Sequence, residues 1–265
     1  MKTEQIDHFR SHGYVIVEDL FTAVEVAAMR AEIERFETDQ LIRNVSTDGD
    51  GQTPSSAKAN LQLCPMSPHS DLFRALPFEP KVLEAVTALI GSPYVLHLDQ
   101  VFLKPPRHGA GTGWHQDNGY FKIEDPLKGT AMWIAIHDGT IANGTLHVMP
   151  DTFRENLEHG RDLDSNHHIS CEVDEAQAVA CEIKAGGVVF FCYGTPHCTR
   201  ANTTDSPRAG AAYHFLHVDH FRKPEPRKDG FHNPILTGPS ASDGTAEHGE
   251  PIAGTWQRHV EALAN

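Results

Sequence analysis

The chain has 265 residues, 39% of them hydrophobic, and a formal net charge of −14 with histidine counted as neutral. This length fits one large domain or two small ones, with enough apolar residues for one substantial core. Phosphate backbones and anionic membranes repel an acidic protein, so nucleic acid and membrane surfaces are excluded as expected partners.

The N-terminal sequence MKTEQIDHFR is polar and lacks the apolar stretch of a secretory signal. No apolar run of the sequence is long enough to cross a membrane. The five cysteines are scattered, their number is odd, and no C-x-x-C pair occurs. This usage is typical of reduced thiols, so we expect a cytoplasmic protein.

The first 92 residues are predicted to be mainly helical. Helices are expected at 3–11, 22–37 and 80–90, with a strand at 14–17. Thr22 and Glu25 form a capping box at the start of the second helix, and Pro80 and Gly91 mark the ends of the third. Between them, 43–60 is rich in Gly, Ser, Thr, Asp and Pro and predicts a mobile loop. Two interpretations of this loop stay open: a surface excursion, or a lid over a pocket.

From about residue 93 the pattern changes to short stretches of strand-forming residues separated by Gly, Pro and Asn. Strands are predicted at 94–104, 113–121, 130–136, 145–149, 179–183, 188–192 and 208–218. This pattern favours a barrel or sandwich. An irregular insertion is expected at 151–175, and a closing helix at 256–263. The chain is predicted to be one domain (1–265), with a helical support at about 1–92, a β core at about 93–220 and a tail at 221–265.

The stretch GWHQDNGYFKI at 113–123 places His115 and Asp117 two positions apart. On a strand these side chains share one face. An imidazole and a carboxylate there make two thirds of a facial iron site. His197, in FFCYGTPHCTR, is the best candidate for the third ligand. The H-x-D pattern alone is weak, because it recurs at 97–99 and 217–219.

Arg208 follows His197 by eleven positions and begins a predicted strand. Gly210, Ala212 and His214 would share its face by the two-residue period, and the two small residues leave room for a ligand. Arg208 could then bind a co-substrate carboxylate as a bidentate fork. The alternatives are a surface salt bridge for Arg208 and a hydrogen-bonded core histidine at 197.

A zinc site made of Cys192, His197 and Cys198 is another alternative. Adjacent residues on a strand point to opposite faces, and this spacing is not a recognised zinc pattern.

The segments WHQDNGYF, MWIAIHDGTIANGTLHVMP and YGTPHCTRANTTDSPR resemble the phytanoyl-CoA dioxygenase (PhyH) family. FRSHGYVIVEDLFTAVEV and LFRALPFEPKVLEAVTALIGSPYVLHLDQVFLKPP extend the resemblance over roughly residues 5–220. It implies a mainly β fold, a double-stranded β-helix or jelly roll with flanking N-terminal helices. It also implies hydroxylation of a small molecule by a non-haem Fe(II)-dependent dioxygenase. O₂ and 2-oxoglutarate are the co-substrates, and 2-oxoglutarate is decarboxylated to succinate and CO₂.

By this resemblance His115, Asp117 and His197 match the metal ligands, and Arg208 matches the arginine that holds the distal carboxylate of 2-oxoglutarate. Further co-substrate contacts are implied at Trp133, Gln100 and Gln62, although one relative has Lys at the position of Gln62. Halogenases of the family replace the carboxylate ligand by a small residue, so the presence of Asp117 disfavours halogenation. The candidates for substrate contact are Asn118, Tyr120, Phe121, His137, Asn143 and His214.

Several questions stay open at this stage. The same cofactors also support desaturation, epoxidation or cyclisation. A non-catalytic jelly roll that binds metal and a ligand would keep the histidines but would not need Arg208. Lys104 and Arg107 are too few to bind the phosphates of a coenzyme A thioester, which disfavours the family's namesake substrate. The sequence does not indicate an oligomeric state.

Overall fold

Two antiparallel sheets form the centre of the protein, whose computed structural model describes residues 1–222 and 228–264. Within these residues the larger sheet has the strand order β1-β11-β6-β13-β4-β3-β2, and the smaller has the order β10-β7-β12-β5. The larger sheet contains β1 (Tyr14–Val17), β2 (Arg43–Asn44), β3 (Leu61–Leu63), β4 (Tyr94–Lys104), β6 (Gly129–Ala135), β11 (Val188–Cys192) and β13 (Arg208–His217). The smaller contains β5 (Thr112–His115), β7 (Leu146–Val148), β10 (Val179–Ala180) and β12 (His197–Thr199). The prediction of a mainly β jelly roll is confirmed.

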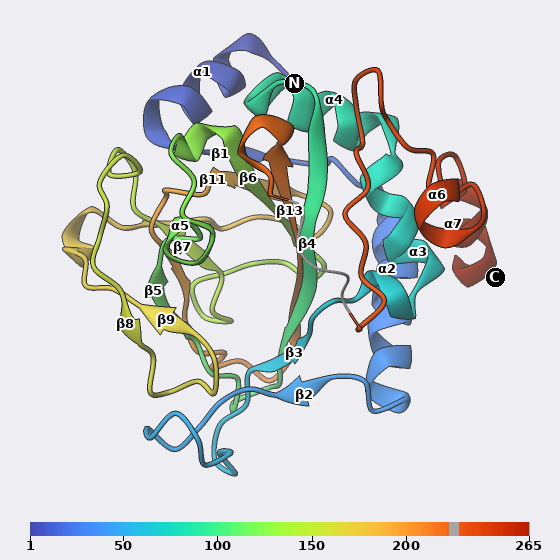
Figure 1. Cartoon of the computed structure of the whole chain (residues 1–265). Helices are drawn as coiled ribbons and strands as arrows, with labels where there is room; N and C mark the ends of the chain where they lie inside the picture. Colours follow the sequence, from blue (N-terminus) through green and yellow to red (C-terminus); the bar gives the residue numbers. More distant parts are fainter. Residues whose placement is uncertain (223–227, 265) are drawn as a thin grey trace.

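Helices cover the outer face of the larger sheet (Figure 1). They are α1 (Thr3–His12), α2 (Ala23–Thr38), α3 (Asp71–Ala75), α4 (Pro80–Ile90), α6 (Thr245–His248) and α7 (Trp256–Ala264). Helix α7 packs on α2 and α3, so the C-terminal segment closes the helical layer. The predicted helices at the N-terminus, at 80–90 and at the C-terminus agree with α1, α2, α4 and α7 to within one or two residues.

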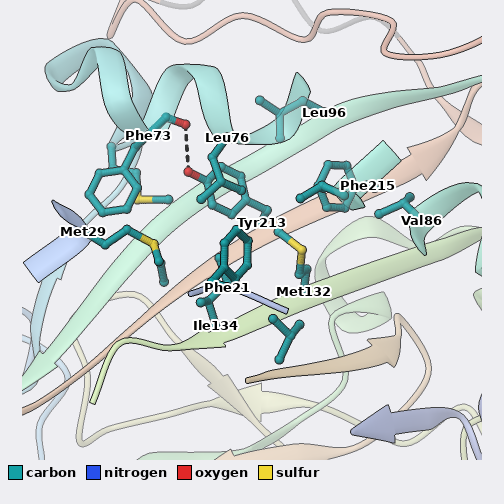
Figure 2. Close-up of a cluster of buried hydrophobic side chains, with 14 of the residues drawn as sticks. Phe21, Met29, Phe73, Leu76, Val86, Leu96, Met132, Ile134, Tyr213 and Phe215 are labelled. Carbon is teal, nitrogen blue, oxygen red and sulfur yellow. Dashed lines mark hydrogen bonds between the residues drawn. The ribbon is translucent and has the colours of Figure 1, made fainter. Parts of the chain in front are cut away.

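The main hydrophobic core lies between these helices and the sheet. Met29, Phe73 and Val86 come from α2, α3 and α4, and they meet Met132 and Tyr213 from β6 and β13 (Figure 2). The hydroxyl of Tyr213 donates to the carbonyl of Phe73 at 2.8 Å, which satisfies a polar group inside the core. Burial of this apolar surface, at about 25 cal/mol per Å², fixes the helical layer to the back of the larger sheet.

Strand β13 shows how the core and the opposite face are separated. Tyr213 and Phe215 point into the helical core. Arg208, Ala212 and His214 alternate with them and line a cavity on the other face. One face of β13 therefore packs against the helices and the other faces the interior of the jelly roll, in the two-residue alternation that the sequence predicted.

The predicted strand at 113–121 is wrong in its second half. Strand β5 ends at His115, and the short helix α5 (Asn118–Phe121) follows. Asp117 has helical dihedral angles, with φ −56° and ψ −31°. The side-chain oxygen of Asn118 accepts from the backbone N–H of Ile123 at 2.8 Å, and the amide donates to the carbonyl of Ile123 at 3.1 Å. This local side-chain bonding competes with a strand ladder and turns the chain.

The segment 43–60, predicted as a loop without structure, is partly ordered by pairing. It begins with β2, which pairs with β3. It also contacts the 151–175 insertion: Thr47 N–H donates to the carbonyl of Asp164 at 3.0 Å, and Asn166 N–H donates to that of Val45 at 3.0 Å. The insertion carries the strand pair β8 (Gly160–Arg161) and β9 (Ile169–Ser170). A lid function for 43–60 stays a prediction.

Apart from α6, the described part of the C-terminal tail is irregular up to α7, but it is packed: Phe231, Leu236 and Ile252 join the main core. The predicted tail at 221–265 includes 223–227 and 265, which lie outside the described residues. Over the parts of the chain that are described, no helix has both the length and the apolar character needed to cross a membrane. The division into one domain stays a prediction.

Candidate metal centre and co-substrate pocket

His115 and His197 face each other on neighbouring strands. They are paired in the register of β5 and β12, and their ring centroids lie 4.2 Å apart. The Nδ1 of His115 lies 2.9 Å from the carbonyl of Gly113, and the Nδ1 of His197 lies 3.0 Å from that of Thr195. Because a carbonyl only accepts, we infer that each Nδ1 carries the proton. Each Nε2 then keeps the lone pair that binds a metal.

Asp117 completes the group from the turn that follows β5. One ligand atom from each of His115, Asp117 and His197 lies within 4.8 Å of the others. The Oδ1 of Asp117 is 3.8 Å from the Nε2 of His197. Two imidazoles and one carboxylate are the donor set of non-haem Fe(II) oxygenases, so these residues fit that metal.

The charge states of this group also fit a metal. Burial alone would raise the pKa of Asp117, but the nearby His214 and His197 outweigh it and hold that pKa well below its usual range. Burial, reinforced by the neighbouring His115, lowers the pKa of His197 to about 3. A carboxylate and a neutral imidazole are the forms that bind a divalent cation near neutral pH.

A cavity of about 260 Å³ extends from this group to Arg208, which is fully buried. The Cζ of Arg208 lies 5.6 Å from the ring centroid of Trp133, and its Nη2 donates to the carbonyl of Gly144. Its Nε has no hydrogen-bond partner among the described residues. Burial lowers the pKa of Arg208 to about 9, so the group stays charged at neutral pH. A buried cation with a spare N–H beside a cavity fits a carboxylate ligand.

Lys104 was considered in the sequence only as a phosphate ligand, but in the structure it lies next to the cavity. It is the strand partner of Arg208 and is almost fully buried. Its Nζ donates to Thr199 Oγ1 at 2.9 Å and to the carbonyls of Ala110 and Arg200. Burial, together with the charge of Arg208, lowers its pKa well below the usual range. Lys104 therefore joins β4 to the end of β12 beside the cavity. Its position opposite Arg208 follows from the pairing of β4 with β13 and is not evident from the sequence.

Most of the other predicted site residues line the same cavity: Gln62, Gln100, Tyr120, Phe121, Trp133 and His214. Gln62 Nε2 donates to Gln100 Oε1 at 2.9 Å, so these two side chains form one polar unit. His168, from the 151–175 insertion, also lines the cavity and was not predicted. No sequence signal points to His168, because the insertion has no periodicity.

Three predicted substrate contacts do not line the cavity, which gives their predicted role no support. Asn118 closes the turn with Ile123. Asn143 accepts from Thr140 N–H at 2.9 Å and donates to a neighbouring carbonyl in the loop after β6. The Nδ1 of His137 accepts from Ala209 N–H at 3.1 Å.

The zinc alternative is disfavoured by where its thiols lie. Cys192 belongs to the main hydrophobic core, whereas Cys198 packs in a separate cluster with Trp114 and Met149. Burial raises the pKa of Cys192 to about 11 and that of Cys198 to about 12. Thiols that stay protonated at neutral pH are poor metal ligands.

A jelly roll that carries two histidines, one carboxylate and a buried arginine around a single cavity has the architecture of Fe(II)- and 2-oxoglutarate-dependent oxygenases. The family model of phytanoyl-CoA dioxygenase (PhyH) matches residues 9–210. This match spans more than half of the sequence, and the chain belongs to the PhyH family. It is an Fe(II)- and 2-oxoglutarate-dependent dioxygenase.

Similar proteins support this assignment. An ectoine dioxygenase of Stutzerimonas stutzeri (strain A1501) is 26% identical over 237 residues, covering 82% of this chain and 77% of that protein. The α-ketoglutarate-dependent carbocyclase SnoK of nogalamycin biosynthesis superposes with a TM-score of 0.71 at 20% identity, covering 89% of this chain and 97% of that one. EctD from S. alaskensis, with 2-oxoglutarate and 5-hydroxyectoine, superposes with a TM-score of 0.66 at 22% identity, covering 85% and 82%. At these identities the two structures establish a shared fold.

Proposed function

We propose that the protein hydroxylates a small molecule, with His115, Asp117 and His197 as the Fe(II) ligands and Arg208 as the anchor of 2-oxoglutarate. One observation carries this proposal: the three potential ligands and the buried arginine with its spare N–H line the same cavity. A protein that only binds metal would have no use for a buried cation at the far end of that cavity.

The residues have separate tasks in this reaction. Iron, when bound, supplies the activation of O₂ that couples oxidation of 2-oxoglutarate to oxidation of the substrate. His115 and His197 present their Nε2 atoms, and the carbonyls of their own chain segments hold the rings. Arg208 binds and orients the distal carboxylate of the co-substrate, and Trp133 packs against the guanidinium. The apolar walls exclude water from the oxidation.

The cavity also limits the substrate. Its volume of about 260 Å³ must hold the co-substrate as well, whereas pockets for drug-sized ligands run from about 300 to 1,000 Å³. Gln62 Oε1 and His168 Nδ1, which are buried beside it, have no hydrogen-bond partner among the described residues. A buried polar group without a partner costs about 1–3 kcal/mol, so a ligand with polar groups is favoured. We infer a small, polar substrate rather than a coenzyme A thioester.

The test is succinate formation from 2-oxoglutarate, measured with and without added Fe(II), for the wild type and for His115→Ala. Iron-dependent succinate that disappears in the variant supports the proposal. A panel of small polar compounds, ectoine among them, is then screened for faster succinate release. Mass spectrometry of the product separates hydroxylation, which adds one oxygen, from desaturation or cyclisation, which removes two hydrogens.

A tightly coupled enzyme would release no succinate without its substrate. Binding of 2-oxoglutarate to the iron-loaded protein is therefore measured by calorimetry in parallel. Iron binding without binding of 2-oxoglutarate would sink the proposal in favour of the non-catalytic alternative, and failure to bind iron would contradict both.

For the compartment, we propose the cytoplasm. Cys171, Cys181, Cys192 and Cys198 carry free thiols in the described part of the chain. Fractionation of cells that express a tagged full chain tests this, and recovery in a secreted fraction would contradict it.

A further inference from the structure

A third histidine, outside the ligand group, contacts the carboxylate of the metal centre. His214, on β13, lines the cavity from the larger sheet, whereas Asp117 comes from the turn after β5. The Nε2 of His214 lies 3.2 Å from the Oδ2 of Asp117. The side chains of His214 and Asp117 are 4% and 7% exposed, so water does not replace this contact.

The two oxygens of Asp117 therefore have different neighbours. Oδ1 lies 3.8 Å from the Nε2 of His197, which is one of the potential metal ligands. Oδ2 is buried and faces the Nε2 of His214 at 3.2 Å, but it has no well-aligned hydrogen-bond donor among the described residues. A buried carboxylate oxygen without a donor is costly, and the N–H of an imidazole provides one.

Asp117 needs such a donor more than the histidine ligands do. His115 and His197 each have a ring nitrogen fixed by a carbonyl two residues earlier. Asp117 lies beyond the end of its strand, and the imidazole that faces its Oδ2 comes from the opposite sheet. We propose that His214 is a positioning residue, whose Nε2–H holds Oδ2 of Asp117 so that Oδ1 alone is presented to the metal. This inference rests on the metal centre of the proposed function.

The backbone around His214 supports the role. In the pairing of β13 with β4, His214 lies opposite Leu98, but Phe215 lies opposite Leu96, so β4 carries one extra residue at this point. Such bulges redirect side chains and are frequent beside active sites. Phe121 and Tyr193 pack near the imidazole, with ring centroids 5.8 and 6.0 Å from it. The ring of His214 is therefore held by packing as well as by the carboxylate.

The test is Fe(II) affinity of the metal-free protein, measured anaerobically by competition with a chelator, without turnover. His214→Leu removes the donor, and we expect about 10- to 100-fold weaker iron binding, as is typical for loss of a residue that orients a ligand. His214→Gln places an amide N–H near the position of Nε2 and is expected to stay within a few-fold of the wild type. The visible charge-transfer band of the iron–2-oxoglutarate complex is a second readout, which should shift in His214→Leu and return in His214→Gln.

His217→Gln is the matched control. His217 lies on the same strand, and its Nδ1 is 3.5 Å from Asp219 Oδ2, a His–Asp contact outside the cavity. Its iron affinity should equal that of the wild type. If thermal melting shows that His214→Leu does not fold, His214→Asn is used in its place. The shorter amide of asparagine does not reach Oδ2, so this variant should bind iron about tenfold more weakly than His214→Gln.

The outcomes separate this inference from the proposed function. If the wild type binds no iron, the proposed function fails. If the wild type binds iron and His214→Leu, or Asn in its place, binds it equally well, only the positioning role is overturned. Unchanged iron affinity with a raised substrate KM would make His214 a substrate contact, as the sequence had indicated.

Discussion

The two sheets build the two ends of the site in different ways. In the larger sheet, β4 and β13 pair along almost their whole length, and helices cover its outer face. This sheet provides Arg208, Trp133 and His214 at positions fixed by the strand period. The smaller sheet has strands of two to four residues. It provides His115 and His197, and it leaves Asp117 to a turn.

The turn depends on contacts with several loops. Gln116 Nε2 donates to the carbonyls of Gly194 at 2.6 Å and Glu155 at 2.7 Å, and Gln116 N–H lies 3.0 Å from the Nε2 of His159. Asn118 N–H donates to the carbonyl of Tyr193 at 2.8 Å. A long paired sheet therefore positions the proposed co-substrate end, whereas loop contacts and the proposed contact from His214 position the proposed metal end. We therefore expect loss of a metal ligand to abolish turnover. A change at the co-substrate end should instead reduce the affinity for 2-oxoglutarate gradually.

The largest effect is expected for Asp117→Ala. It removes one of three iron ligands but little core volume, so turnover should fall to background while the thermal melt keeps one cooperative transition. Succinate formation and circular dichroism check the two parts. Asp219→Ala, which changes the exposed carboxylate of the H-x-D pair at 217–219, should leave activity unchanged. Retention of full activity in Asp117→Ala would end the assignment of the metal site.

Arg208→Lys should give a graded effect. Lysine keeps the charge but loses the planar fork and the packing on Trp133. Loss of a charged hydrogen bond of about 1.5–3 kcal/mol corresponds to a Kd for 2-oxoglutarate raised about 10- to 100-fold. Iron affinity, measured by the same chelator competition, should stay constant because Arg208 is not in the ligand group. A parallel loss of iron affinity would contradict the separation of the two ends.

The sequence predicted the parts of the molecule that follow a regular period. The bounds of β4 and β11 and of helix α4 agree with prediction, because apolar alternation, Pro80 and Gly91 are local signals. The shared face of Arg208, Ala212 and His214 followed from the period of β13. The family motif likewise placed Arg208 and Trp133 beside one cavity.

What could not be predicted depends on contacts between distant segments. The turn after Asp117 depends on the bond from Asn118 N–H to the carbonyl of the distant Tyr193, in addition to the local bonds between Asn118 and Ile123. The two-residue period therefore predicted a shared strand face for His115 and Asp117 that the structure does not have. The bulge between β4 and β13 changes which side chains of β4 share a face. The residue pattern of a single strand does not reveal such a change. His168 reaches the cavity because the 151–175 insertion packs beside segment 43–60.

A smaller effect is expected from Gly210→Ala, which tests how rigid the co-substrate end is. A Cβ at Gly210 would lie 2.7 Å from the ring of Trp133. Overpacking of this kind costs about 1–3 kcal/mol, and it should displace Trp133 from Arg208. We expect a lower melting temperature and a Kd for 2-oxoglutarate raised several-fold. Gly160→Ala is the control, because a Cβ there meets nothing within 4 Å. Equal melting temperatures and Kd values for both variants would show that the larger sheet adapts more easily than its pairing indicates.

The smallest effect concerns pH and His137, which joins the end of β6 to the start of β13. Its Nδ1 accepts from Ala209 N–H, one residue from Arg208. Burial, reinforced by the charges of Arg30 and Arg208, lowers its pKa to about 4, from an ordinary value of 6.5. Between these values the unfolded chain binds more protons than the folded protein. Stability is therefore complete above about pH 6.5 and falls as the pH drops toward 4.

His137→Asn keeps an acceptor for Ala209 N–H but does not titrate. The free energy of unfolding of this variant, from urea titrations between pH 7 and 4, should fall less steeply than that of the wild type, by up to about 1.4 kcal/mol per pH unit. The remaining slope comes from other buried groups such as His197. His108→Asn, at an exposed position, is the control and should reproduce the wild-type slope. Identical slopes for all three proteins would show that the start of β13 opens to water before the protein unfolds, and the larger sheet would then be less rigid than its pairing indicates.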